Sequence, residues 1–112
     1  MTFAPFDVIV VPFPYSDVLA EKRRPAVVVS ASVLEAQLGV VWLAMITSVG
    51  GPLRLGDAAL TDLTAAGLTV PSRVRAGKLA TLDLTRVVRR AGSLAPADAA
   101  AVTAALRECA AF

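Results

Sequence analysis

Apolar and β-branched residues in this chain gather into short runs that turn residues separate. Residues 7–13, Asp-Val-Ile-Val-Val-Pro-Phe, predict a buried strand that leads into a loop, because prolines stand at positions 12 and 14. Residues 25–30 and 39–48 predict two further strands, both central, with room for a short helical turn within residues 31–38. Residues 14–24 have no sustained periodicity and are expected to form an exposed connection.

The second half of the chain opens with a break at Gly50-Gly51-Pro52. Weak strands are expected around residues 53–60, followed by a turn at Gly67. Residues 72–83 alternate polar with apolar side chains and predict a half-buried strand with a bulge at Gly77. The solvent side of this strand is expected to carry three cations, which are Arg73, Arg75 and Lys78.

The last segment predicts a helix. Residues 85–90 fit a further short strand or turn, and Pro96 is typical of the first position of a helix. Within that helix Val102, Leu106 and Ala110 recur at helical spacing, which predicts one apolar stripe facing the sheet. The whole pattern predicts a mainly β fold, a small curled barrel with a C-terminal helix packed on it.

The composition refines this picture. A length of 112 residues suits one domain, so residues 1–112 are expected to share a single core. Hydrophobic residues make up 56% of the chain and charged residues only 18%, which is more apolar than an ordinary globular domain. Part of that apolar surface is expected to lie in an interface between copies of the chain.

The sequence has none of the features expected of a membrane or secreted protein. No apolar stretch reaches the roughly 18 to 20 residues that span a bilayer. The N-terminal segment lacks the basic start and the apolar stretch of a secretion signal, and the only cysteine, Cys109, cannot form an internal disulfide. We therefore expect a cytoplasmic protein with no membrane partner.

Charge and the missing residue types limit the chemistry. The net charge is +2, with eleven Lys and Arg residues that cluster in the sequence. The chain has no histidine, which excludes a Ser-His-Asp triad and a histidine-centred metal site. No glycine-rich phosphate loop follows a strand. No metal and no cofactor are expected, so the candidate chemistry depends on cations and hydroxyls.

The densest group of cations is Lys22-Arg23-Arg24, directly before the strand predicted at residues 25–30. Arg24 adjoins that strand and is the best anchored of the three, and its planar guanidinium matches phosphate oxygens. A basic run of this kind is also typical of a solvated turn.

Two hydroxyls, Thr47 and Ser48, close the strand predicted at residues 39–48, beside the glycine-rich break. They could donate hydrogen bonds to a phosphate, or they could serve only the neighbouring turn. Trp42 and Met45 lie inside the same apolar strand and are interpreted as core or interface residues.

Four motifs occur in order along the chain: Asp7-Val-Ile-Val-Val-Pro-Phe-Pro, Arg23-Arg24-Pro25-Ala26-Val27-Val28-Val29-Ser30, Ala44-Met-Ile-Thr47-Ser48 and Lys78-Leu-Ala-Thr81-Leu-Asp83. Together they resemble the MazF/PemK toxins of bacterial toxin–antitoxin systems over nearly the whole chain. The resemblance implies a dimeric, SH3-like β-barrel that cleaves single-stranded RNA without a metal. It also implies a cognate antitoxin that blocks the RNA site with an extended segment.

The resemblance also implies roles for individual residues. By matching positions, the catalytic arginine of the family falls on Arg24 and the catalytic threonine on Thr47. Arg75 matches a basic position of PemK-like members, some of which carry an aspartate thought to act in catalysis where this chain has Gly77. The expected RNA-binding residues are Lys22, Arg23, Ser48, Arg73, Arg75 and Lys78.

Cleavage of RNA without a metal requires the 2′-hydroxyl to attack its own phosphate, with one proton taken, charge stabilised and one proton supplied. A guanidinium with a pKa above about 12 is a poor base, so we assign Arg24 to charge stabilisation and Thr47 to donation to a nonbridging oxygen. No residue stands out as the general base.

A second interpretation remains open. The chain could be a noncatalytic protein of the same fold that acts by binding a protein, such as a topoisomerase. It could also be a family member that has lost activity. Both alternatives remain because Gly77 stands where some members carry the aspartate. A plain single-strand-binding module is less favoured, because such modules rely on exposed aromatic residues. Sequence preference in RNA would depend on the loop at residues 14–23.

Overall fold

The computed structural model describes residues 2–13 and 22–112. In this part of the chain six strands form one antiparallel sheet in the order β4-β5-β3-β2-β1-β6. The strands are β1 (Asp7–Phe13), β2 (Lys22–Val28), β3 (Val40–Ser48), β4 (Asp57–Ala59), β5 (Ser72–Asp83) and β6 (Arg89–Ser93). The helices are α1 (Ser32–Leu38), α2 (Leu63–Ala66), the 3-10 turn η1 (Leu84–Arg86) and α3 (Pro96–Cys109).

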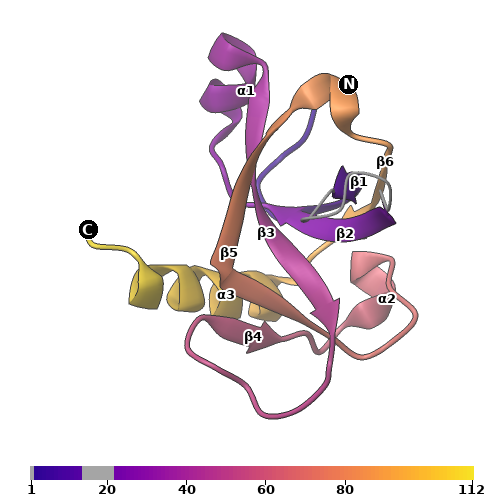
Figure 1. Cartoon of the computed structure of the whole chain (residues 1–112), viewed down its shortest axis with the longest axis vertical. Coiled ribbons are helices and arrows are strands. Elements are labelled where there is room, and N and C mark those ends of the chain that lie inside the picture. Colours follow the sequence, from indigo (N-terminus) through magenta and orange to yellow (C-terminus); the bar gives the residue numbers. More distant parts are fainter. Residues whose placement is uncertain (1, 14–21) are drawn as a thin grey trace.

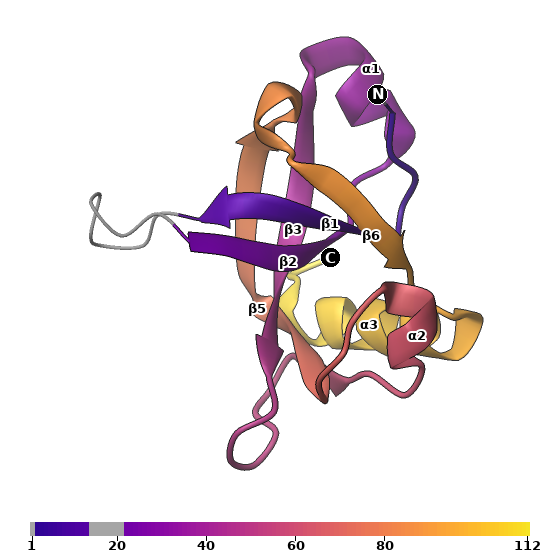
Figure 2. The same cartoon turned by 90° about the vertical axis from the view of Figure 1, so that its right-hand side faces the viewer.

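The sheet is strongly curled. In Figure 1 the long strands β3 and β5 run side by side, and β2 crosses them. The perpendicular view shows the β1–β2 pair projecting to one side, with β6 lying across it (Figure 2). The ends of the curled sheet do not pair with each other, so β4 and β6 remain its edges. The predicted mainly β fold with a C-terminal helix is confirmed, and its curled sheet is open.

Each face of the sheet buries its own core, because neighbouring residues of a strand point to opposite faces. One core lies under α2 and α3 and includes Val8, Val27, Ile46, Val74 and Val102. The other lies where the sheet curls over itself and includes Phe3, Ile9, Val28, Leu43 and Met45. Thr47, in the candidate site, continues this second face at the end of β3, where the apolar side chains give way to polar ones.

Most predicted elements are confirmed. The bounds of β1 and β5 are those expected, α1 occupies the predicted helical turn, and Pro96 opens α3. The prediction for β2 is wrong at its start, because residues 22–24 are not part of a loop. They pair with residues 11–13 of β1 and extend the hairpin. Within residues 53–60 only the short strand β4 forms, and α2 was not expected.

The structure also tests the predictions for Met45, for Trp42 and for the apolar stripe of the C-terminal helix. Met45 is buried in the core, whereas Trp42 is 49% exposed and is therefore not a core residue. In α3 the predicted stripe holds for Val102 and Leu106 and fails for Ala110, which is exposed and lies after the last helical residue. No helix in the described part of the chain is long and apolar enough to cross a membrane.

Candidate functional site

Arg24 and Thr47 lie on neighbouring strands and share one face of the sheet. The pairing of β2 with β3 ends where Ala26 lies opposite Met45. Arg24 is two residues from Ala26 and Thr47 two residues from Met45, so both point to the face of that pair. Both residues line one depression of about 290 Å³, which we call the central depression; Ser48 and residues 67–70 also line it. The structure therefore brings together the two residues that the sequence singled out.

Arg24 is held by a strand and not by a loop. It pairs with Val11 of β1 and is half-buried. Among the described residues no acceptor reaches its buried Nε. Because a buried N–H donor without an acceptor costs free energy, this guanidinium is suited to an anion that a ligand would bring.

A larger depression of about 540 Å³ lies on the other side of Thr47. We call it the loop pocket, because the loop between β3 and β4 forms one wall and β5 forms another. In addition to Thr47, its lining includes Ser48, Gly51, Pro52, Arg54, Arg73 and Arg75. Arg73 pairs opposite Thr47, and Arg75 pairs opposite Met45, so both arginines share the face of Thr47.

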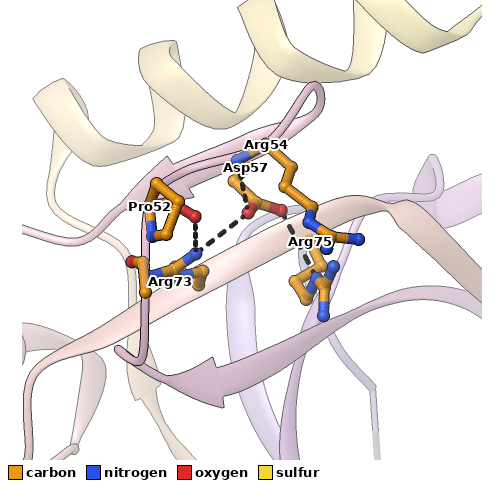
Figure 3. A network of polar contacts seen from close by, with 6 residues as sticks. Pro52, Arg54, Asp57, Arg73 and Arg75 are labelled. Carbon is orange, nitrogen blue, oxygen red and sulfur yellow. Dashed lines mark hydrogen bonds and ion pairs between the residues drawn. The ribbon is translucent and has the colours of Figure 1, made fainter.

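Arg73 is buried, which contradicts the expectation that it lies on the solvent side of β5. Its side chain is only 6% exposed. Its Nη1 donates to the carbonyl of Pro52 at 2.9 Å and to Oδ2 of Asp57 at 3.2 Å, and its Nη2 donates to the carbonyl of Gly51 at 2.7 Å (Figure 3). The prediction was wrong because the loop between β3 and β4 folds over this end of β5.

Asp57 of β4 connects the arginines of the loop pocket (Figure 3). Its side chain is 2% exposed, accepts from the backbone N–H of Arg54 at 2.9 Å and lies 3.4 Å from Nε of Arg75. Burial alone would raise the pKa of Asp57, but hydrogen bonds from Arg54 and Arg73 and the charge of Arg75 outweigh burial and hold the pKa below its usual value. The Asp57 carboxylate thus contacts the side chains of Arg73 and Arg75 and the backbone of Arg54. Three guanidinium groups line the pocket against this one carboxylate, so positive charge remains in excess beside Thr47.

A third depression, of about 360 Å³, lies on the far side of Arg24 and is lined by Arg23, Arg24 and Arg89. It shares Arg24 with the central depression, which in turn shares Thr47 and Ser48 with the loop pocket. The three depressions therefore form a series across the sheet with arginines along its length. A series of this shape suits an extended polyanion better than a compact ligand.

Two of the expected RNA-binding cations lie outside this series. Lys22 is exposed at the start of β2. Lys78 is exposed in β5. The register of β5 against β3 shifts beside Lys78, because Ala44 pairs with Leu79 whereas the next residue of β3, Met45, pairs with Arg75. This shift in register confirms the predicted bulge at Gly77.

Sequence reasoning missed Arg54, Asp57 and Arg89 as members of the site. Arg54 is the only cation between Val49 and Gly56, which was a usable signal. The position of Asp57 depends on its pairing with Arg75 across the sheet, which no local pattern reveals. No group of three or more His, Cys, Asp or Glu side chains within residues 2–13 and 22–112 could hold a metal ion.

Comparison with known proteins agrees with the fold. The family described as "PemK-like, MazF-like toxin of type II toxin-antitoxin system" matches residues 4–110, and the chain belongs to this family. The resemblance seen in the sequence motifs is thereby confirmed. A sequence search among curated proteins gave no match.

Several solved structures share the fold. One is an endoribonuclease in complex with its cognate antitoxin from a Mycobacterial species, with 18% identity, a TM-score of 0.75 and coverage of 92% of this chain and 89% of that chain. The Mycobacterium tuberculosis toxin MazF-mt6 has 21% identity, a TM-score of 0.72 and coverage of 89% and 91%. MazF from Deinococcus radiodurans has 20% identity, a TM-score of 0.74 and coverage of 95% and 94%. At these identities the likeness shows the fold.

Proposed function

We propose that this toxin-family chain is an endoribonuclease that cleaves single-stranded messenger RNA in the cytoplasm without a metal or cofactor. The observation that carries the proposal is the series of three depressions with Arg24 and Thr47 at its centre. The series passes between arginines on β2, β5, β6 and the loop before β4, which suits the phosphates of an extended RNA strand.

The proposed reaction uses the 2′-hydroxyl of the substrate as the nucleophile. The 2′-oxygen bonds to phosphorus and the bond to the 5′-oxygen breaks, which leaves a 2′,3′-cyclic phosphate and a 5′-hydroxyl. Arg24 stabilises the added negative charge through its guanidinium, and the Thr47 hydroxyl donates to a nonbridging oxygen. Solvent water takes the proton of the 2′-hydroxyl, and solvent water supplies the proton that the leaving 5′-oxygen takes up.

Neighbouring residues are proposed to hold the rest of the strand. On one side of Arg24 the RNA backbone is bound by Lys22 and Arg23. On the other side it is contacted by Ser48 and Arg75. Lys78 adds charge at longer range. Arg73 acts indirectly, because its Nη donors are already engaged by Gly51, Pro52 and Asp57.

Two protein partners belong to the proposal. A cognate antitoxin would cover the arginine-lined depressions with an extended segment. The structure of the Mycobacterial relative, solved in complex with its cognate antitoxin, supports an antitoxin partner. A second copy of the chain would cover the apolar face that exposes Trp42 and Leu79. The mass of the protein in solution tests the homodimer, and a monomer at micromolar concentration would reject it.

The function is tested with Arg24→Ala, which removes the guanidinium from the central depression. Cleavage of a single-stranded RNA should fall by about 10² to 10³-fold, as for other stabilisers of an oxyanion, while the thermal unfolding temperature changes little. Arg86→Ala, at an exposed position of η1 outside the three depressions, is the matched control and should cleave normally. RNA with a single 2′-deoxy group at the scissile nucleotide should bind and remain uncut.

Equal cleavage by Arg24→Ala and the wild-type chain would reject the mechanism. Wild-type protein that binds RNA without cutting it would favour the noncatalytic alternative, which Gly77 keeps open. Wild-type protein that ignores RNA would favour a toxin that acts on a protein.

A further inference from the structure

The loop between β3 and β4 is fastened at three points by two buried side chains. Arg73 holds the carbonyls of Gly51 and Pro52, and Asp57 holds the backbone N–H of Arg54 (Figure 3). A hydrogen bond of 3.2 Å joins the two side chains. This segment contains the consecutive glycines Gly50 and Gly51, which lose much backbone freedom on ordering. The contacts therefore determine the position of the wall of the loop pocket.

The second partner of Asp57 faces the pocket. Arg75 is 31% exposed, and its Nε contacts Oδ1 of Asp57 at 3.4 Å. A guanidinium presents donors along two edges, and engagement of Nε by the carboxylate leaves the Nη donors of the other edge for a second partner. Arg75 lines the loop pocket together with Ser48 and Arg54, so these donors are available to a phosphate there.

We propose that Asp57 is a positioning residue for RNA binding: it orients Arg75 and, through Arg73, sets the loop that walls the pocket beside Thr47. The inference rests on the proposed function and concerns the same site. Asp57 itself is almost fully buried and touches no RNA in this proposal. Its effect is exerted entirely through the two arginines.

For Asp57→Asn, the positioning role predicts a change in RNA affinity opposite to the change expected from net charge alone. Asp57→Asn makes the site more positive, so a purely ionic view predicts tighter binding of RNA. Positioning predicts weaker binding, because the asparagine cannot hold both arginines as firmly as the carboxylate does. The two views therefore differ in the sign of the change.

The experiment measures binding of a 2′-deoxy-blocked RNA and steady-state cleavage of the all-ribose RNA by full-length variants. For Asp57→Asn we expect Kd and KM to rise about tenfold, as for loss of one charge-assisted hydrogen bond, with kcat nearly unchanged. Asp83→Asn, which removes the same charge at the other end of β5, is the control and should change neither. Circular dichroism and thermal unfolding verify that each variant is folded.

Arg75→Lys tests the same idea without disturbing Asp57. Lysine keeps the charge and lacks the guanidinium edge, so we expect binding nearly as weak as that of Arg75→Ala. In the Arg75→Ala background, Asp57→Asn should weaken binding by clearly less than tenfold, since part of its effect passes through Arg75. The comparison of Arg75→Lys with Arg75→Ala leaves Asp57 intact and keeps the proposal testable if Asp57→Asn does not fold.

The outcomes separate this proposal from the proposed function. Active wild-type protein combined with unchanged or tighter binding by Asp57→Asn would overturn the positioning role alone. Full retention of binding by Arg75→Lys would also overturn it. A wild-type chain that neither binds nor cuts RNA would overturn the proposed function, and the positioning role with it.

Discussion

Gly67 shows how strictly one residue is constrained beside the candidate site. It ends α2 in the left-handed conformation with a φ of 73°, and it lines the central depression. A Cβ at this position would collide with the carbonyl group of Ala91 in β6. Backbone, rather than a flexible side chain, occupies the space, so the clash cannot be relieved by a change of rotamer.

We predict that Gly67→Ala destabilises the chain by clearly more than the left-handed conformation alone accounts for. That conformational cost is about 1–2 kcal/mol for a residue with a Cβ. Gly39→Ala is the matched control, because Gly39 has a φ of 68° and open space around its Cβ position. Urea unfolding of both variants gives the comparison, and equal losses of unfolding free energy would refute the role of the Ala91 contact.

At the level of elements, Asp98 ties α3 to the turn that precedes α2. This side chain is buried, and it accepts hydrogen bonds from the backbone and hydroxyl of Thr61 and from the backbone of Asp62, all between 2.8 and 3.1 Å. Asp62 in turn caps α2 through the backbone N–H of Ala65. The helix thus fixes the segment that leads to residues 67–70 of the central depression.

We predict that Asp98→Ala lowers the free energy of unfolding by about 2–4 kcal/mol, because it removes the buried carboxylate that accepts all of these hydrogen bonds. Glu108→Ala, at an exposed position of the same helix, should change it by less than about 0.5 kcal/mol. Chemical denaturation measures both values. Similar stability of the two variants would show that the turn does not depend on Asp98.

The sequence predicted elements well where the signal is local and less well where it depends on pairing. Residues 72–83 alternate along their length, so β5 was predicted with its bulge. Lys22, Arg23 and Arg24 carry no strand signal of their own and join β2 only because β1 lies opposite. Likewise, the burial of Arg73 depends on Asp57, which lies 16 residues earlier in the chain. Arg24 and Thr47 were found because each stood beside a strong local signal.

For the molecule as a whole, buried carboxylates link stability to pH. The pKa of Asp98 is lowered, because hydrogen bonds from Asp62 and Thr61 outweigh the burial that would otherwise raise it. The pKa of Asp57 is lowered in the same way by Arg54, Arg73 and Arg75. Both groups bind protons less readily in the folded chain than in the unfolded one, where their pKa is near 3.8.

Since the folded-state pKa values lie below the unfolded ones, both groups contribute their full stability only above about pH 5. The contribution decreases as the pH falls through 3.8 and is lost below the folded-state values, because the unfolded chain takes up the protons first. We therefore predict that the free energy of unfolding is flat between about pH 5 and 7 and falls steeply below about pH 4.

Asp57→Asn and Asp98→Asn should each be less stable at pH 7 and show a shallower fall in acid, because one carboxylate no longer titrates. Urea unfolding at a series of pH values, at constant ionic strength, measures these slopes. Asp62→Asn is a suitable control for stability, because its side chain is exposed and asparagine also caps helices, so its unfolding free energy at pH 7 should be close to that of the wild-type chain. If the Asp57 and Asp98 variants kept the wild-type slope, acid sensitivity would have to come from other groups.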